Sequence, residues 1–303
     1  MVLLLQRWVW KYCQGTGGTY MRGIICYRWS ILASTLGVLL VLTGVGSVNA
    51  SARTLTSDQL PSRVVWSESF AGAEGTGVNQ QIWKYDTGKG VFGTGEIETM
   101  TNSASNVALD GMGYLAFTAV KSGGSWTSGR IQTIGTFTPP AGGEMMVSAL
   151  IKQPWPANAL GYWPAFWLLG PGPWPADGEI DIMEDVSALS LHSGTLHCGD
   201  LAQKNPDGTT GPCHEYTGLT SGLVVCSQCQ TGFQTYSVVV DRRDSGNEQI
   251  RWYLDGRKFY AVNERQVGTA AWTQAVDHGF SIIFDLARVL RQAARPHLAD
   301  RCS

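Results

Sequence analysis

The sequence is poor in charge and lacks any cluster of basic residues in its body. Lysine, arginine, aspartate and glutamate make up only 15% of its 303 residues, and the formal net charge is −2. A nucleic-acid-binding domain usually presents a basic face, so this composition argues against that class of protein. Internal repeats, low-complexity segments and a visible interdomain linker are also missing. We therefore expect one domain, and a content of 44% hydrophobic residues is enough to build a large core for it.

Helical periodicity is missing as well. From Arg63 onward no stretch keeps a helical hydrophobic period for three turns, and short apolar segments alternate with turn residues instead. This pattern predicts strands over residues 64–70, 114–120, 144–152, 165–169, 179–183, 235–241 and 249–254. Asp255-Gly256 then supplies type I′ turn chemistry into a further strand over 258–262. Many short strands of this kind predict an all-β antiparallel sandwich with one face curved around a groove.

The first fifty residues have the features of an export signal. Two arginines precede an apolar run from Ile31 to Val48, and Val48-Asn49-Ala50 offers short side chains to a signal peptidase. The pattern predicts a secreted protein whose mature chain begins near Ser51, and it indicates Met21 as the true start of translation. The alternative is a membrane anchor that is retained, because a run of 18 residues approaches the length that spans a bilayer.

Four of the seven cysteines cluster in one loop-rich stretch, namely Cys198, Cys213, Cys226 and Cys229. In an oxidising compartment four neighbouring cysteines predict two disulfides, and pairing of Cys198 with Cys213 and of Cys226 with Cys229 is favoured. A zinc site is the alternative, because Cys226 and Cys229 have ligand spacing and two histidines lie nearby. The export signal favours the disulfides.

The segment from Gly178 to Asp185 concentrates acidic residues on one predicted strand. Glu179 and Asp181 share a face of that strand, whereas the isoleucines that follow each of them face the core. Glu184 joins the acidic face only if a β-bulge one or two residues before it inserts an extra residue. The sequence therefore predicts such a bulge.

Three carboxylates on one face of a sheet repel each other, so their presence calls for a functional reason. Retaining glycoside hydrolysis uses two carboxyl groups roughly 5 to 5.5 Å apart, one ionised to attack the anomeric carbon and one protonated to serve the leaving oxygen. The two glutamates can lean together to close that gap. Asp181 between them can hydrogen-bond the nucleophile and help to keep the partner acid protonated. A solvated acidic edge or a calcium site is the alternative that the spacing alone leaves open.

The motif Glu179-Ile-Asp-Ile-Met-Glu184 resembles the Glu-x-Asp-x-x-Glu signature of glycoside hydrolase family 16, in particular of its laminarinase-like endo-1,3(4)-β-glucanases. Further similar segments are residues 83–88, 95–102, 128–131, 161–170, 174–178 and 194–199. The resemblance covers about residues 61 to 287. It implies a jelly-roll β-sandwich of the concanavalin A-like type with a concave substrate cleft. It also implies Glu179 as the nucleophile, Asp181 as the auxiliary acid and Glu184 as the general acid/base.

Three tryptophans shortly before this motif are suited to bind sugar, because a glucosyl ring stacks on indole while polar groups contact its hydroxyls. They are Trp163, Trp167 and Trp174. The first two are four residues apart and so point to one side of a strand, with Phe166 pointing to the core. The resemblance implies that both line the cleft. Ordinary core packing of either is the alternative.

The resemblance implies three further residues of the substrate site. His197 is expected near the catalytic carboxylates, and Asn102 and Arg130 are expected to line the cleft. A packing role for the histidine is the alternative, and a turn asparagine and a surface arginine are common in any protein.

The family pattern breaks near the end of the chain. Asp285 stands where the family has asparagine, and a divergent tail of residues 288–303 stands where a glycine-rich, tryptophan-bearing turn and further strands are expected. We therefore expect a leader over residues 1–50, a catalytic domain over 51–287 and this tail. Truncation of the C-terminal strands would expose a strand edge and weaken folding and activity.

The expected function is retaining, endo-acting hydrolysis of β-1,3 or mixed β-1,3/1,4 glucan by a secreted monomer. No cofactor, metal, nucleic acid or obligate protein partner is expected. The alternative is a non-catalytic β-glucan-binding protein on the same fold, which the presence of both catalytic glutamates disfavours. Linkage preference and a structural calcium ion stay open at the level of sequence.

Overall fold

The computed structural model describes residues 2–6, 11–14, 63–90, 94–155, 161–187 and 189–289. The predicted leader run over residues 31–48 and the tail beyond Val289 lie outside these residues. No helix among the residues described combines the length and the apolar character needed to cross a bilayer.

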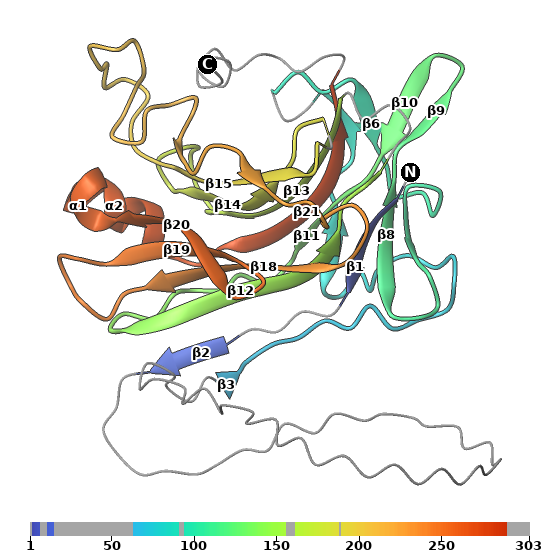
Figure 1. Ribbon diagram of the computed structural model, residues 1–303, viewed down its shortest axis with the longest axis horizontal. Helices are drawn as coiled ribbons and strands as arrows, with labels where there is room; N and C mark the ends of the chain where they lie inside the picture. The colour runs from blue at the N-terminus through green and yellow to red at the C-terminus, as the bar shows by residue number, and fades with distance from the viewer. Residues whose placement is uncertain are drawn as a thin grey trace, which may run out of the picture.

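Two antiparallel sheets face each other and enclose the core (Figure 1). The first contains, in spatial order, β20 (Arg257–Asn263), β19 (Gln249–Leu254), β18 (Gln234–Asp241), β12 (Gly143–Lys152), β1 (Val2–Gln6), β8 (Tyr114–Thr118) and β7 (Val107–Leu109). Paired beside this row are β2 (Lys11–Gln14), which joins β12, and β3 (Arg63–Val64), which joins β2.

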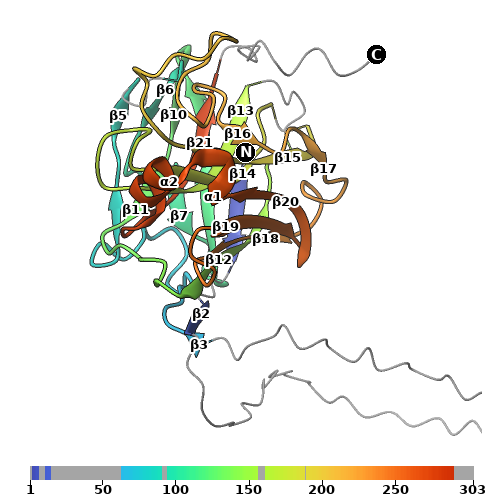
Figure 2. The same ribbon diagram turned by 90° about the vertical axis from the view of Figure 1, so that its left-hand side faces the viewer.

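The second sheet carries the acidic motif in its middle. Its order is β16 (Leu219–Thr220), β15 (Leu191–His197), β14 (Glu179–Glu184), β13 (Tyr162–Leu169), β21 (Ser281–Arg288), β11 (Arg130–Thr133) and β4 (Trp83–Tyr85), with β17 (Val224–Val225) paired to β15. A smaller sheet is formed by β5 (Gly88–Lys89), β6 (Glu98–Met100), β10 (Ser125–Ser128) and β9 (Val120–Ser122). Two short helices, α1 (Glu264–Val267) and α2 (Thr269–Val276), lie at one end of the sandwich (Figure 2).

Alternation along the strands builds the core between the two large sheets. In β12 the side chains of Met145, Val147 and Ile151 are fully buried and face inward, while their neighbours in the sequence are more exposed. From the second sheet, Phe166 of β13 stacks on Phe284 of β21 with ring centroids 4.8 Å apart. The inward side of the second sheet is thus filled, which leaves its outward side to carry the polar residues of the site.

Most of the predicted strands are present in the structure. The predicted hairpin is confirmed, because β19 pairs with β20 and the turn residues Asp255 and Gly256 have φ angles of 48° and 75°. The predicted strand over residues 64–70 is wrong beyond Val64. Glu68 explains this difference, because its carboxylate accepts the backbone N–H groups of the next two residues, which a sheet would otherwise use.

Strand β1 was not expected from the sequence, which places residues 1–50 in a leader. Its backbone lies between β8 and β12 and pairs antiparallel with both, with Leu4 opposite Ala116 on one side and Lys152 on the other. At the other end of the chain, β21 continues through Arg288, the first residue of the predicted tail. All eight residues of β21 are buried, so the departure from the family pattern at Asp285 does not interrupt the strand.

Candidate active site

Strand β14 contains the predicted β-bulge. Asp181 pairs with Thr195 and Glu184 with Ser193, so three steps along β14 correspond to two steps along β15. On its other side, the pairing with β13 likewise skips Ile182. The extra residue turns Glu184 to the same side as Glu179 and Asp181, as the spacing of the motif requires.

A pocket of about 450 Å³ lies in front of these carboxylates. Its walls come from β6, β11, β13, β14, β15 and β21, and from the loops before β6, between β13 and β14, and after β15. The lining residues are Thr94, Glu96, Met100, Arg130, Trp163, Ala165, Trp167, Trp174, Glu179, Asp181, Glu184, His197, Tyr216, Asp285 and Ala287. The structure therefore gathers all three predicted catalytic residues and five of the six predicted substrate-binding residues at one place.

The carboxylates of β14 share a poorly solvated environment. Burial, followed by the charge of Asp181, raises the pKa of Glu179 to about 8, while the nearby His197 opposes this rise. Asp181 and Glu184 are themselves buried. Because the charges of Asp181 and Glu184 act on Glu179, the protons of the cluster belong to the group as a whole, and a positive charge beside Glu179 favours its ionised form.

His197, on β15, supplies that charge. Its Nε2 lies 3.4 Å from Oδ2 of Asp181 and 3.8 Å from Oε1 of Glu179, and its Nδ1 lies 2.6 Å from Oε2 of Glu215. Burial by itself would lower the pKa of His197, but hydrogen bonds to Asp181 and Glu215 outweigh it and hold the pKa well above its ordinary value. The structure thus favours the polar role of His197 over the packing role.

The same residues have the spacing of a cation site, since Glu179, Asp181 and His197 each offer a ligand atom and these atoms lie within 4.8 Å of one another. The imidazole already contacts both carboxylates, which explains the cluster as an ion-pair network. We assign no metal ligand to it.

Trp163 and Trp167 lie on β13 with their indole rings toward the pocket. Trp163 donates from Nε1 to Oε1 of Glu184 at 3.0 Å, and Trp167 donates from Nε1 to Oδ2 of Asp285 at 2.9 Å. The guanidinium of Arg130 covers one face of Trp167 at 4.6 Å from the ring centroid. That face cannot stack on a sugar, so Trp167 contributes an edge or its opposite face to the pocket.

Trp174 and Tyr216 form an exposed aromatic pair at the pocket. Their rings stack with centroids 5.7 Å apart and an interplanar angle of 15°, and 38% of Trp174 and 69% of Tyr216 remain accessible. The sequence predicted Trp174 but not Tyr216. Tyr216 comes from the loop after β15, and its spacing from the motif gives no signal that could have found it.

Asp285 is a further carboxyl group in the pocket that the sequence did not assign to the site. Burial raises the pKa of Asp285 to about 7, although the charge of Arg130 opposes this rise. The only available signal was its position, because family 16 has asparagine where this chain has aspartate.

Asn102 is not brought to the pocket. It is exposed in the segment that follows β6 and does not line the cavity. The preceding segment contributes Thr94, Glu96 and Met100 instead. The conformation of this segment decides which of its residues face the pocket, and the resemblance alone could not indicate that.

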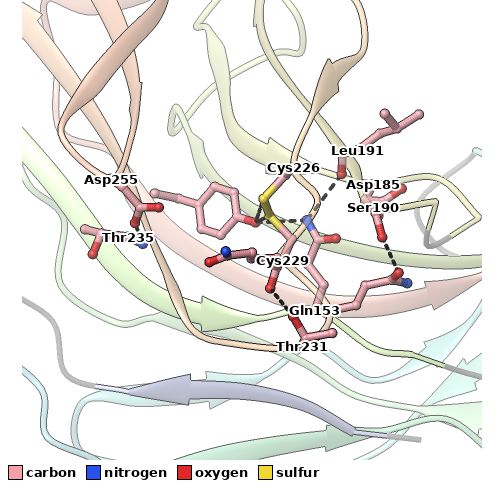
Figure 3. Close-up of a disulfide and its surroundings, with 12 residues drawn as sticks. Gln153, Asp185, Ser190, Leu191, Cys226, Cys229, Thr231, Thr235 and Asp255 are labelled. Atoms are coloured by element: carbon pink, nitrogen blue, oxygen red, sulfur yellow. Dashed lines mark hydrogen bonds between the residues drawn. A yellow bond between two sulfur atoms is a disulfide. The ribbon is translucent and has the colours of Figure 1, made fainter.

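Both predicted disulfides are present. Cys198 bonds to Cys213 beside the pocket, and Cys226 bonds to Cys229 in a loop next to Gln153 (Figure 3). The zinc alternative is wrong, because sulfur atoms in these disulfides are not thiolate ligands. The first disulfide closes the loop that precedes Glu215 and Tyr216.

Two stacked antiparallel sheets, with a pocket of carboxylates and tryptophans on the outer side of one of them, define the class of β-sandwich glycoside hydrolases. The chain belongs to glycoside hydrolase family 16, since residues 97–268 match the model of the XgeA-like, catalytic GH16 domain. The crystal structure of endo-1,3-beta-glucanase from Streptomyces sioyaensis is 41% identical, with a TM-score of 0.67 over 73% of this chain and 83% of that chain.

Two curated relatives agree with this membership. Glucan endo-1,3-beta-glucosidase A1 of Niallia circulans is 30% identical over 74% of this chain, which spans only 33% of that protein. Beta-glucanase of Rhodothermus marinus is 27% identical over 85% of this chain and 85% of that protein. The resemblance seen in the sequence is confirmed, and the mostly antiparallel β structure matches the jelly-roll structures of the family.

Proposed function

We propose that this protein is a retaining, endo-acting glycoside hydrolase that cleaves β-1,3 or mixed β-1,3/1,4 glucan. The observation that carries the proposal is the bulge in β14, because it turns Glu184 into the pocket that already contains Glu179 and Asp181. The names of the relatives, which include endo-1,3-beta-glucanase and beta-glucanase, support β-glucan as the substrate class.

In the proposed reaction Glu179 attacks the anomeric carbon while Glu184 gives a proton to the departing glycosidic oxygen. The bond from the anomeric carbon to that oxygen breaks, and a covalent glycosyl ester on Glu179 forms. Glu184, now ionised, then takes a proton from water, which attacks the same carbon and releases Glu179. The product keeps the β configuration because the carbon is inverted twice.

Neighbouring residues have defined parts in this reaction. Trp163 donates its indole N–H to Glu184 and so fixes the position of the proton donor. Asp181 lies between the two glutamates along the strand and contacts His197, which balances the negative charge. No step of this mechanism needs a cofactor. We further propose secretion, which the leader pattern and the two disulfides support.

Product analysis on a panel of polysaccharides tests the proposal. Incubation with laminarin, lichenan and agarose should release oligosaccharides from laminarin or lichenan, with the β anomer seen first by NMR. Binding to laminarin without any cleavage would support the alternative of a glucan-binding protein. Cleavage of agarose alone would shift the substrate class to galactan-type polymers.

Replacement of Trp174 by alanine is expected to raise KM for laminarin by roughly 5 to 30-fold with little change in kcat, as loss of about 1–2 kcal/mol of stacking predicts. The reason is that Trp174 and Tyr216 offer sugar an aromatic surface at the pocket, away from the bond that breaks. Trp155→Ala is the matched control, because Trp155 is 64% exposed and does not line the pocket. Equal KM values for the Trp174 variant and the control would contradict the role of this pair.

A further inference from the structure

The buried carboxylate behind the pocket is that of Glu215. Only 3% of this residue is exposed, and both of its oxygens have partners. Oε1 accepts the backbone N–H of Cys198 at 3.0 Å, and Oε2 lies 2.6 Å from Nδ1 of His197. The disulfide between Cys198 and Cys213 closes the loop that brings Glu215 back to this position. Glu215 is thus fixed at two points.

This arrangement determines where His197 carries its protons. A carboxylate accepts hydrogen bonds, so Nδ1 of His197 must donate to Glu215. On the other side of the ring, Nε2 faces the oxygens of Asp181 and Glu179, which are also acceptors when ionised. Both ring nitrogens therefore carry a proton, and the imidazole is a buried cation between carboxylates on opposite sides.

The neighbouring backbone also fits the ring closely. Gly218 has a φ of 72°, and a Cβ atom there would lie 2.9 Å from Cε1 of His197. On the remaining side, the ring of Trp174 lies 5.6 Å from the imidazole, measured between centroids. His197 therefore has little room to turn away from the carboxylates.

We propose that Glu215 is a positioning residue that holds His197 doubly protonated and aimed at Glu179 and Asp181. This inference rests on the proposed function of Glu179 as the nucleophile. The groups that act on Glu179 are Asp181 and Glu184 from its own strand, His197 from β15, and Glu215 from the loop. Among these His197 is the positive one, and it lies nearer to Glu179 than Glu215 does, because Glu215 contacts the far nitrogen of the ring.

These positions determine how loss of the charge on Glu215 changes the pKa of Glu179. Without the charge of Glu215, one proton on Nε2 satisfies Asp181, and His197 becomes neutral more readily. His197 and residue 215 then change from one positive and one negative charge to two neutral groups. Since the positive charge is the closer one, its loss disfavours the ionised form of Glu179. Activity that needs ionised Glu179 is then lost at a higher pH than in the unmodified protein.

Glu215→Gln tests this proposal in the full-length protein, because the amide oxygen can still accept the N–H of Cys198. The acidic limb of the pH profile of kcat/KM for laminarin should move upward by roughly 1 unit, while KM at high pH and the thermal unfolding temperature stay close to the original values. Asp207→Asn is the matched control. It removes the carboxylate from an exposed histidine pair in the same loop, with Nδ1 of His214 at 3.2 Å, and it should leave the pH profile unchanged.

Two further measurements separate this proposal from a structural role and from the proposed function. In a His197→Gln background, Glu215→Gln should cause no further shift of the acidic limb; an additional shift of similar size would overturn the proposal. Nitrogen NMR of the imidazole should show His197 doubly protonated at pH 7.5 in the unmodified protein and neutral in Glu215→Gln. A neutral His197 in the unmodified protein would also overturn the proposal. Since this readout needs no turnover, inactivity on every glucan would refute the proposed function alone.

Discussion

Replacement of Glu179 by alanine should lower kcat on laminarin by at least roughly a thousandfold, because it removes the carboxylate that forms the glycosyl ester in the proposed reaction. Glu184→Ala should cause a comparable loss on laminarin, whose leaving group needs a proton. On an aryl β-glycoside with an acidic phenol as the leaving group, however, Glu184→Ala should still form the ester quickly. A burst of phenol would then precede slow turnover, whereas Glu179→Ala should give no burst.

Added azide distinguishes the two glutamates by stereochemistry. In Glu179→Ala, azide can enter the space of the missing carboxylate and attack once, so the product should be the α-glycosyl azide. In Glu184→Ala, azide should attack the ester on Glu179 and give the β-glycosyl azide. NMR of the isolated azides makes the assignment directly.

The reverse result would interchange the roles of nucleophile and general acid/base between Glu179 and Glu184. The electrostatics of the pocket make this outcome worth testing. Burial and Asp181 raise the pKa of Glu179 to about 8 even with His197 beside it, a value that suits a proton donor better than a nucleophile. A β-azide from Glu179→Ala would show that this carboxyl is the acid. Asp181→Asn is the matched variant at the intervening position, and its azide products should match those of the unmodified protein.

The local structure of the acidic strand was predictable from the sequence because two simple rules conflict there. Alternation of side chains places Glu179 and Asp181 on one face, and the hydrophobic Ile180 must face the core. Glu184 breaks the alternation, and a bulge resolves the conflict with a single added residue. The hairpin at Asp255-Gly256 was predictable for a similar reason, since positive φ angles at both turn positions select these residue types.

Contacts between distant segments could not be predicted in the same way. Glu215 reaches His197 only because the chain turns back after β15, and nothing in the residues between them specifies that path. Tyr216 and Asp285 enter the pocket for the same reason, from a loop and from a strand far along the chain. The pairing of β1 with β8 and β12 likewise depends on the tertiary arrangement. Local propensity describes elements, whereas these contacts depend on how elements are packed.

A substitution at Gly178, directly before β14, is expected to cause a large loss of stability. Gly178 has a φ of 75°, and a Cβ atom at this position would lie 2.2 Å from the backbone oxygen of Ala275 in α2. Gly178→Ala should therefore combine a strained backbone with a collision that no side-chain rotation can relieve. We expect a loss of roughly 3–5 kcal/mol of unfolding free energy, visible as a lower midpoint in urea denaturation.

Gly246→Ala separates the two contributions, because Gly246 has a similar φ of 82° but a Cβ atom added there would meet nothing within 4 Å. This control should lose only about 1–2 kcal/mol, the cost of a left-handed backbone conformation. Equal losses for both variants would show that α2 does not press on the strand. A larger loss at Gly178, accompanied by a fall in kcat of the folded fraction, would show that the packing of α2 helps to hold Glu179 in place, since the two residues are adjacent in the chain.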